Sequence, residues 1–171
     1  MHRDFRKPLI VMTPKSLLRH KHCVSNLDDF DKKNSYHRVL WDHAIDPKVK
    51  GFIKLKKPKK IKKVIICSGK IYFDLLEERE KLRKNDVVFY RIEQLYPFPA
   101  KSLANELKPY AKNANFYWCQ EEPKNMGAWF SVRDYIQWTL DNIKANNNKI
   151  SYIGRSPDAS PATGYFKRHM L

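Results

Sequence analysis

Two neighbouring carboxylates, Glu121 and Glu122, lie in a short stretch that also holds Asn125 and is bounded by Trp118 and Trp129. The stretch joins an apolar run of strand character to a helical pattern, which is where α/β sheets present polar groups. A carboxylate pair can act as general acid and base, but neighbouring residues of an extended segment point to opposite faces and do not converge on one atom. We therefore interpret these five residues as a structural loop or an interface, with one carboxylate accepting backbone or arginine hydrogen bonds and the tryptophans as packing anchors.

A second candidate comprises Ser68, Gly69 and Lys70, which follow a strand signal and precede a helix signal. Backbone N–H groups at a helix start and a nearby ammonium both attract negative charge, so these residues could form an anion cradle. The alternative is a tight turn with a solvated lysine. The further glycines of a phosphate loop or a dinucleotide fingerprint are missing here, which disfavours nucleotide hydrolysis and nicotinamide binding.

The histidines and cysteines follow no recognisable metal or nucleophile pattern. The six histidines are scattered, and the odd count of widely spaced cysteines, Cys23, Cys67 and Cys119, suits neither a metal cluster nor a disulfide framework. No serine lies in a glycine-flanked elbow. The sequence therefore predicts no metal site and no catalytic residue, and it favours a reducing compartment.

Positive charge dominates the composition. The 171 residues carry a formal charge of +16 with 42% hydrophobic content, enough for one domain with a core. Seven lysines lie within residues 54–63; such a run is typically an exposed connector, and we expect poor order near residues 54–60. The start of the chain lacks the apolar core of a signal peptide, and no apolar run approaches the roughly 20 residues that cross a bilayer, so neither export nor a membrane span is predicted.

Strand and helix signals alternate along the rest of the chain. The sequence predicts strands at 63–67, 87–92, 116–120 and 150–153, and helices at 71–84, 100–110 and 128–143. The strands are near-continuous apolar runs, typical of a parallel sheet covered on both faces. We predict a three-layer α/β/α domain with a mostly parallel sheet of about five strands. An isolated strand at 8–12, a helical turn at 15–20 and a last helix at 163–170 complete the expected elements.

Five blocks, in this order, resemble the C-terminal region of thiamine-dependent 2-oxoglutarate dehydrogenase, its decarboxylating component. They are residues 13–20 (TPKSLLRH), 67–70 (CSGK), 91–99 (RIEQLYPFP), 118–129 (WCQEEPKNMGAW) and 159–164 (ASPATG). The resemblance implies a transketolase C-terminal-like α/β domain at residues 63–171 and a connector with the lysine-rich stretch at 23–62. Residues 1–22 would be the trailing strand and turn of a missing pyrimidine-binding domain.

The resemblance also implies a function for the intact protein. Enzymes of this family convert 2-oxoglutarate to succinyl-dihydrolipoyl and CO2 in the citric acid cycle, with thiamine diphosphate and magnesium held between two earlier domains. This chain would hold no cofactor and would be inactive alone, serving dimer assembly and regulation. The implied partners are the upstream domains, a second copy in a homodimer and the lipoyl succinyltransferase component, in the cytoplasm of a bacterium or in the mitochondrial matrix of a eukaryote.

Some relatives bind acetyl-CoA as an activator on this domain. The resemblance carries that effector site onto Gln94 in the Arg-Ile-Glu-Gln motif and onto Lys101 and Arg38, while Ser102 replaces a second basic residue that follows the prolines.

A free-standing basic module that holds polyanions through residues 54–63 is the alternative function. Nucleic acid is disfavoured as its ligand, because the aromatic residues lie in the predicted strands and helices and do not alternate with the lysines. Polyanion binding would weaken steeply with salt, whereas a domain of the dehydrogenase would self-associate through an apolar surface.

Overall fold

The computed structural model describes residues 4–31 and 35–165. It divides the chain into two compact units, residues 1–35 and 36–171. The first unit contains two short 3-10 helices, whose side chains are not buried: η1 (Lys15–Arg19) and η2 (Leu27–Phe30). The first of these confirms the helical turn predicted at 15–20.

The strand predicted at 8–12 is wrong. These residues pair with no other described strand, and Leu9, Ile10 and Met12 are largely exposed. Strand formation requires partners for the backbone N–H and C=O groups, and an apolar run does not supply them by itself.

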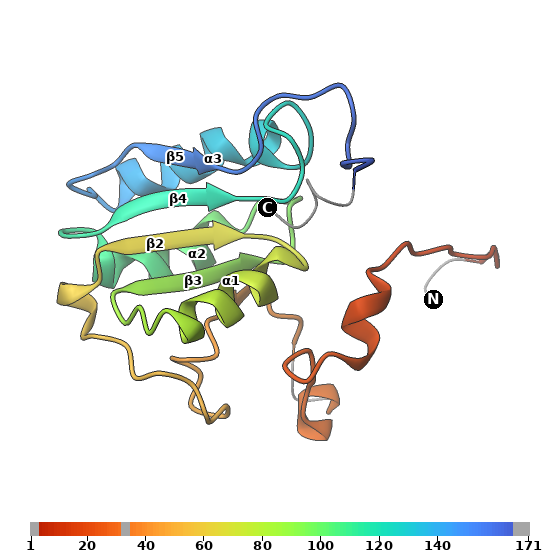
Figure 1. The fold of residues 1–171 in the computed structure, drawn as a ribbon, viewed down its shortest axis with the longest axis horizontal. Helices are drawn as coiled ribbons and strands as arrows, with labels where there is room; N and C mark the ends of the chain where they lie inside the picture. Colours follow the sequence, from red (N-terminus) through yellow and green to blue (C-terminus); the bar gives the residue numbers. More distant parts are fainter. Residues whose placement is uncertain (1–3, 32–34, 166–171) are drawn as a thin grey trace. The chain divides into compact units, whose positions relative to one another are not determined.

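The second unit is built on a five-stranded sheet in the order β1-β3-β2-β4-β5 (Figure 1). The strands are β1 (Val39–Trp41), β2 (Lys63–Cys67), β3 (Val87–Ile92), β4 (Asn115–Cys119) and β5 (Ile150–Ile153). The last four are parallel to one another, and β1 joins the edge antiparallel to β3. The four strands predicted from residue 63 onward are thereby confirmed, within one residue at β4.

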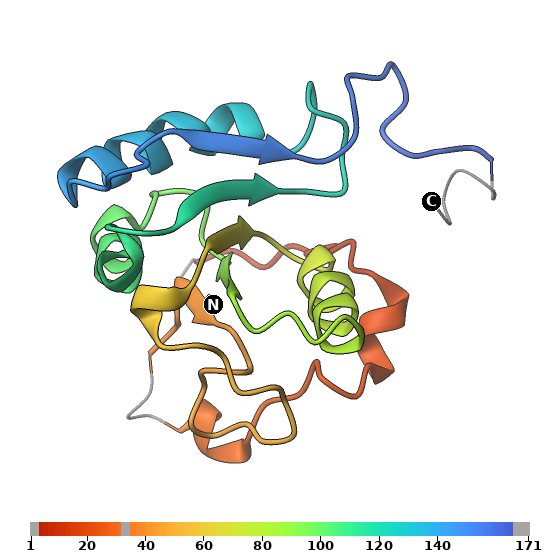
Figure 2. The ribbon, with the colours of Figure 1, turned by 60° about the vertical axis from the view of Figure 1, so that its left-hand side comes forward.

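Helices cover both faces of this sheet, which gives the three layers that the sequence predicts (Figures 1 and 2). The helices are α1 (Ile71–Lys81), α2 (Ala100–Leu107) and α3 (Trp129–Asn142). On the face covered by α2 and α3, Ile66 and Trp118 join a core with Leu103 and Val132. On the opposite face, Tyr72 of α1 packs edge-on against the Phe89 ring, with 6.2 Å between ring centroids.

Two predicted helices end earlier than their apolar pattern. The first ends at Lys81, because Arg83 adopts a left-handed conformation with φ of 49°. The second gives way after Leu107 to the 3-10 turn η4 (Lys108–Tyr110), because Pro109 has no N–H to continue an α-helix. At the C-terminus, residues 163–165 are not helical, and the rest of the helix predicted at 163–170 lies outside the described residues.

Strand β1 is the element that the sequence analysis missed. It lies inside the predicted connector and has only three residues, too few to show a period. Its order comes from pairing with β3, in which Val39 lies opposite Ile92.

The lysine-rich stretch is exposed, as expected, but its backbone is fixed in place. It contains the 3-10 turn η3 (Pro58–Lys60). The Lys56 N–H donates to the Asn85 carbonyl at 2.8 Å, and the Asn113 side chain donates to the Ile61 carbonyl at 2.6 Å. The expectation of poor order ignored these contacts, which link segments far apart in the sequence.

Candidate functional site

The strand order places the two loops singled out from the sequence beside each other. The chain passes from β2 to β3 on one side and then returns to β4 on the other side of β2. The order therefore reverses between β2 and β4, and α/β proteins commonly bind ligands at the carboxyl ends of the strands at such a point. Lys70 follows β2, Glu121 follows β4, and their Nζ and Oε1 atoms are 2.8 Å apart.

Lys70 also contacts Asp74 of α1, at 2.9 Å. Partial burial alone would lower the pKa of the Lys70 ammonium, but its hydrogen bonds to Glu121 and Asp74 outweigh that effect and raise the pKa above its ordinary value. Two carboxylates therefore offset one ammonium, which makes the spot unattractive to an anion. The anion cradle of Ser68, Gly69 and Lys70 stays a prediction, and of the two readings the geometry favours a tight turn, with Gly69 at φ of 73° and the lysine paired.

Gln120, which the sequence analysis took for the last residue of a strand, organises the loop after β4. Its Oε1 accepts hydrogen bonds from the Trp118 indole N–H at 2.9 Å and from the Trp129 backbone N–H at 3.0 Å. Its Nε2 donates to the carbonyls of Glu122, Pro123 and Met126 at 3.3, 3.1 and 2.7 Å. The buried amide of Gln120 thus fixes both ends and the middle of the loop. Its position directly after a buried strand is the signal in the sequence that could have identified Gln120 as the residue that organises this loop.

The five residues interpreted as a structural loop or an interface have distinct surroundings. Trp118 and Trp129 are buried and pack in the core. Glu121 reaches Lys70, as described above, whereas the carbonyl of the exposed Glu122 accepts a hydrogen bond from the Tyr152 hydroxyl at 3.1 Å. Asn125 forms two hydrogen bonds with the backbone of Asp158, at 2.9 and 3.0 Å. These contacts give the loop a structural role, and its role as an interface stays a prediction.

Two of the three predicted effector residues line one cavity. Arg38 and Lys101 border a hollow of about 500 Å³, together with Phe98 and with Trp138 of α3. Gln94 does not line it: the Gln94 side chain donates to the Pro97 carbonyl at 2.6 Å, and its backbone N–H donates to the Arg38 carbonyl at 3.4 Å. The cavity wall is mostly apolar, and Arg38 and Lys101 are its two cationic lining residues.

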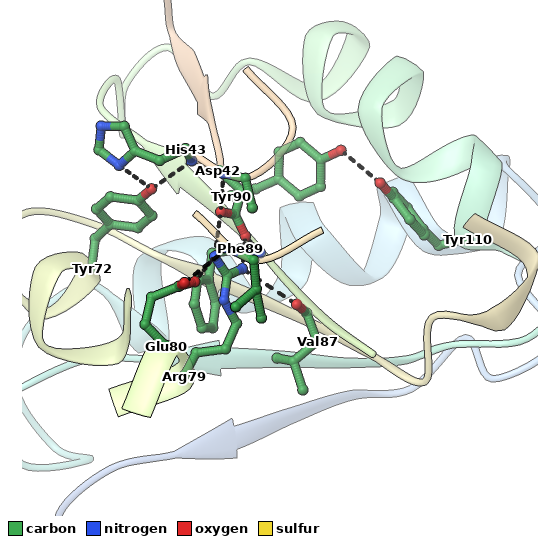
Figure 3. A network of polar contacts seen from close by, with 11 residues as sticks. Asp42, His43, Tyr72, Arg79, Glu80, Val87, Phe89, Tyr90 and Tyr110 are labelled. Atoms are coloured by element: carbon green, nitrogen blue, oxygen red, sulfur yellow. Dashed lines mark hydrogen bonds and ion pairs between the residues drawn. The ribbon is translucent and has the colours of Figure 1, made fainter. Parts of the chain in front are cut away.

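A buried ion pair that the sequence analysis missed lies on the α1 side of the sheet (Figure 3). The two terminal guanidinium nitrogens of Arg79 contact the carboxylate of Asp42, and Nη2 is 2.9 Å from Oδ1. The backbone N–H groups of Phe89 and Ala44 donate to the same carboxylate at 3.0 and 2.9 Å. Because Asp42 follows β1, this network fastens the antiparallel edge strand to α1 and β3.

A tyrosine–histidine pair extends these contacts toward the surface. The Tyr72 hydroxyl lies 2.7 Å from His43 Nδ1 and accepts the His43 backbone N–H at 2.9 Å (Figure 3). Burial raises the pKa of Tyr72. With its phenol kept neutral, Tyr72 serves as a structural hydrogen-bonding partner.

The two buried cysteines are unsuited to act as nucleophiles. Cys67 and Cys119 are register partners at the ends of β2 and β4. Burial raises the pKa of Cys67, and burial with a smaller contribution from Glu121 raises that of Cys119 to about 11. The thiolate is the reactive form, so both groups are inert near neutral pH.

We expect a soluble disulfide reagent at about pH 8 to modify one thiol per native chain, the exposed Cys23, and all three after denaturation. Ellman absorbance measures the count, and Cys23→Ser should remove the fast phase. Rapid reaction of a second thiol in the native chain would contradict the burial described for Cys67 and Cys119.

Within residues 4–31 and 35–165, no three His, Cys, Asp or Glu side chains gather in a way that could hold a metal ion. No helix there has the length and apolar character to cross a membrane.

Comparison with known proteins gives one consistent result. Residues 24–171 match the family model described as 2-oxoglutarate dehydrogenase C-terminal. The chain is 55% identical over 170 residues to proteins named 2-oxoglutarate dehydrogenase E1 component from Brucella anthropi, Brucella abortus and Brucella ovis. Each alignment covers 99% of this chain but 17% of the relative. The chain therefore belongs to the 2-oxoglutarate dehydrogenase C-terminal family.

Proposed function

We propose that this chain is the C-terminal domain of the E1 component of 2-oxoglutarate dehydrogenase, and that the intact protein decarboxylates 2-oxoglutarate in the citric acid cycle. The observation that carries the proposal is the 55% identity over 99% of the chain to proteins of that name. The alternative of a free-standing basic module is not favoured, because the matching relatives are much longer than this chain and align through its whole length.

The domain contributes assembly and support, and the chemistry belongs to the rest of the enzyme. Thiamine diphosphate and magnesium require carboxylate and amide oxygens for the metal and cationic or backbone donors for the diphosphate. The described residues do not fit them: no metal-binding group is present there, and Lys70 at the carboxyl edge of the sheet is already paired with two carboxylates.

Assembly would involve the upstream domains, a second copy in a homodimer and the lipoyl succinyltransferase component. Support comes from the outer side of α3, where three aromatic side chains are half exposed or more: Phe130, Tyr135 and Trp138. Exposed aromatic side chains of this kind mark protein interfaces. The bacterial relatives favour the cytoplasm as the site of action, and the matrix is the counterpart in a mitochondrion.

Regulation by an acyl-CoA is a second part of this proposal. Arg38 and Lys101 supply two positive charges at the rim of the cavity beside Trp138, and Gln94 fixes the backbone next to Arg38. A phosphorylated ligand with an apolar or aromatic portion suits such a lining.

Reconstitution tests the proposed function. We expect the 171-residue chain and a recombinant protein of the upstream domains each to lack activity, and the mixture to sediment as one species that releases CO2 from 2-oxoglutarate. The upstream protein mixed with an unrelated basic protein of similar size is the matched control. A chain that neither associates nor restores turnover would overturn the proposal.

A further inference from the structure

The edge at which the parallel strands begin gathers segments that are far apart in the sequence. Because β2 to β5 run in the same direction, the loops that lead into them all reach this edge. These loops are residues 54–62, 82–86, 108–114 and 143–149. We call the surface that they form, together with Lys63 at the start of β2, the basic edge.

Hydrogen bonds join the four loops into one fixed surface. Lys62 N–H donates to the Asp86 carbonyl at 2.9 Å, which links the first loop to the second. Asn113 links the third loop to the first through its 2.6 Å contact with the Ile61 carbonyl. Asn146 N–H donates to the Ala111 carbonyl at 2.8 Å and links the fourth loop to the third. The backbone positions from which the cationic side chains extend are therefore fixed relative to one another.

The basic edge carries most of the net charge of the protein. Its cationic side chains are all exposed: Lys54, Lys56, Lys57, Lys59, Lys60, Lys62, Lys63, Arg83, Lys84, Lys108, Lys112, Lys144 and Lys149. The single carboxylate there is Asp86, whose Oδ2 lies 3.5 Å from Lys56 Nζ. Thirteen cations against one carboxylate leave twelve positive charges, in a chain whose formal total is +16. A charge concentration of this kind attracts an acidic partner from a distance.

The side chains between the lysines indicate which class of acidic partner fits. Tyr110 and Ile61 are buried and Leu55 packs against the core, so the edge offers no aromatic ring on which a nucleic-acid base could stack. Leu82 is its one exposed large apolar side chain, too little to enter a bilayer. Twelve of the thirteen cations are lysines, which act as point charges on flexible stems and suit the scattered carboxylates of a peptide.

We propose that the basic edge is a docking surface for an acidic protein segment. The surface dimension sets the length of that segment. Four parallel strands span about 14 Å, and an extended peptide rises about 3.3 Å per residue, so about five residues cross the edge. The inference depends on the geometry of this edge and is independent of the enzymatic role proposed above.

Charge reversal at matched positions tests this docking surface. The probe is a fluorescein-labelled peptide of about eight residues rich in Glu and Asp, and the readout is fluorescence anisotropy at low and moderate salt. We expect a triple variant of the edge, Lys60→Glu, Lys112→Glu and Lys149→Glu, to weaken binding about tenfold or more, since each reversal replaces an attraction by a repulsion. A control with the same change in net charge away from the edge, Lys101→Glu, Lys124→Glu and Arg133→Glu, should weaken it about twofold at most.

A second measurement uses the unaltered chain and so does not depend on how the variants fold. Binding of the peptide should slow amide hydrogen exchange in residues 54–62 and 108–114 and leave the loop after β4 unchanged. Equal losses in the two triple variants, or no protection at the basic edge, would overturn the proposal. So would single-stranded RNA or vesicles of anionic lipid that bind more tightly than the peptide through the same lysines, because these would assign the surface to another class of partner.

Discussion

Asp42→Asn should lower the free energy of unfolding by about 3 to 5 kcal/mol, because it removes the fully buried counter-charge of the Arg79 guanidinium and leaves only the partly exposed Glu80, 3.1 Å from Arg79 Nη2. Both side chains are almost completely removed from solvent, at 0% and 2% exposure. The Asp42 carboxylate also accepts the backbone N–H groups of Phe89 and Ala44 (Figure 3). Replacing one carboxylate oxygen by an NH2 group therefore places a hydrogen-bond donor opposite the N–H donors of Arg79 and of the backbone. Urea unfolding followed by circular dichroism measures the loss.

A surface ion pair provides the matched control. Asp134 lies 3.1 Å from Arg133, and its side chain is 81% exposed. We expect Asp134→Asn to change stability by less than about 0.5 kcal/mol, because water screens exposed pairs. The double variant Asp42→Leu with Arg79→Met should regain part of the loss, since it removes both buried charges together but leaves the Phe89 and Ala44 N–H groups without their acceptor. If Asp42→Asn were as mild as Asp134→Asn, Glu80 or water would have to compensate the Arg79 charge, and the Asp42 carboxylate would not be what stabilises this network.

The strength and length of an apolar pattern decide how far the sequence predicts this fold. Strands β2 to β5 and the three helices each carry a continuous or periodic apolar signal, and their buried residues make up the core. β1 has only three residues and forms because it pairs with the edge of β3. Its partner residues are about fifty positions away along the chain, so a local pattern does not reveal the pairing. The strand predicted at 8–12 has the opposite fault: it carries an apolar signal but has no partner among the described residues.

In the candidate site too, local patterns in the sequence predict some contacts, whereas others arise only from the fold. Placing Lys70 and Glu121 at one edge of the sheet follows from two local strand-to-helix patterns, because parallel strands bring such loops together. The Asp42–Arg79 pair could not be found in this way, since each residue by itself resembles an ordinary exposed charge and their partnership spans 37 positions. The basic edge is an intermediate case: the run at 54–63 is visible in the sequence, whereas Lys112 and Lys149 join it through the topology.

Gly127→Ala should lower the free energy of unfolding by about 2 to 4 kcal/mol, through a backbone effect and a contact effect that can be separated. Gly127 adopts φ of 66°, where a side chain adds about 1 to 2 kcal/mol of strain. A Cβ atom would also lie 2.8 Å from Gln120 Nε2. Gln120 cannot move away without breaking its hydrogen bonds to Trp118 and Trp129, which would leave buried donors unpaired at about 1 to 3 kcal/mol each.

Gly69→Ala isolates the backbone effect. Its φ of 73° is similar, but a Cβ atom there would meet nothing within 4 Å, so we expect a loss of about 1 to 2 kcal/mol. Urea unfolding followed by tryptophan fluorescence measures both variants, and of the four tryptophans Trp118 and Trp129 are the buried ones, whose surroundings change most on unfolding. In a Gln120→Ala background the two glycine substitutions should become equally mild, because the group that the Cβ strikes has gone. Equal effects of Gly127→Ala and Gly69→Ala in the unaltered chain would instead mean that the loop after β4 yields to the extra methyl group, and Gln120 would then not be what fixes it.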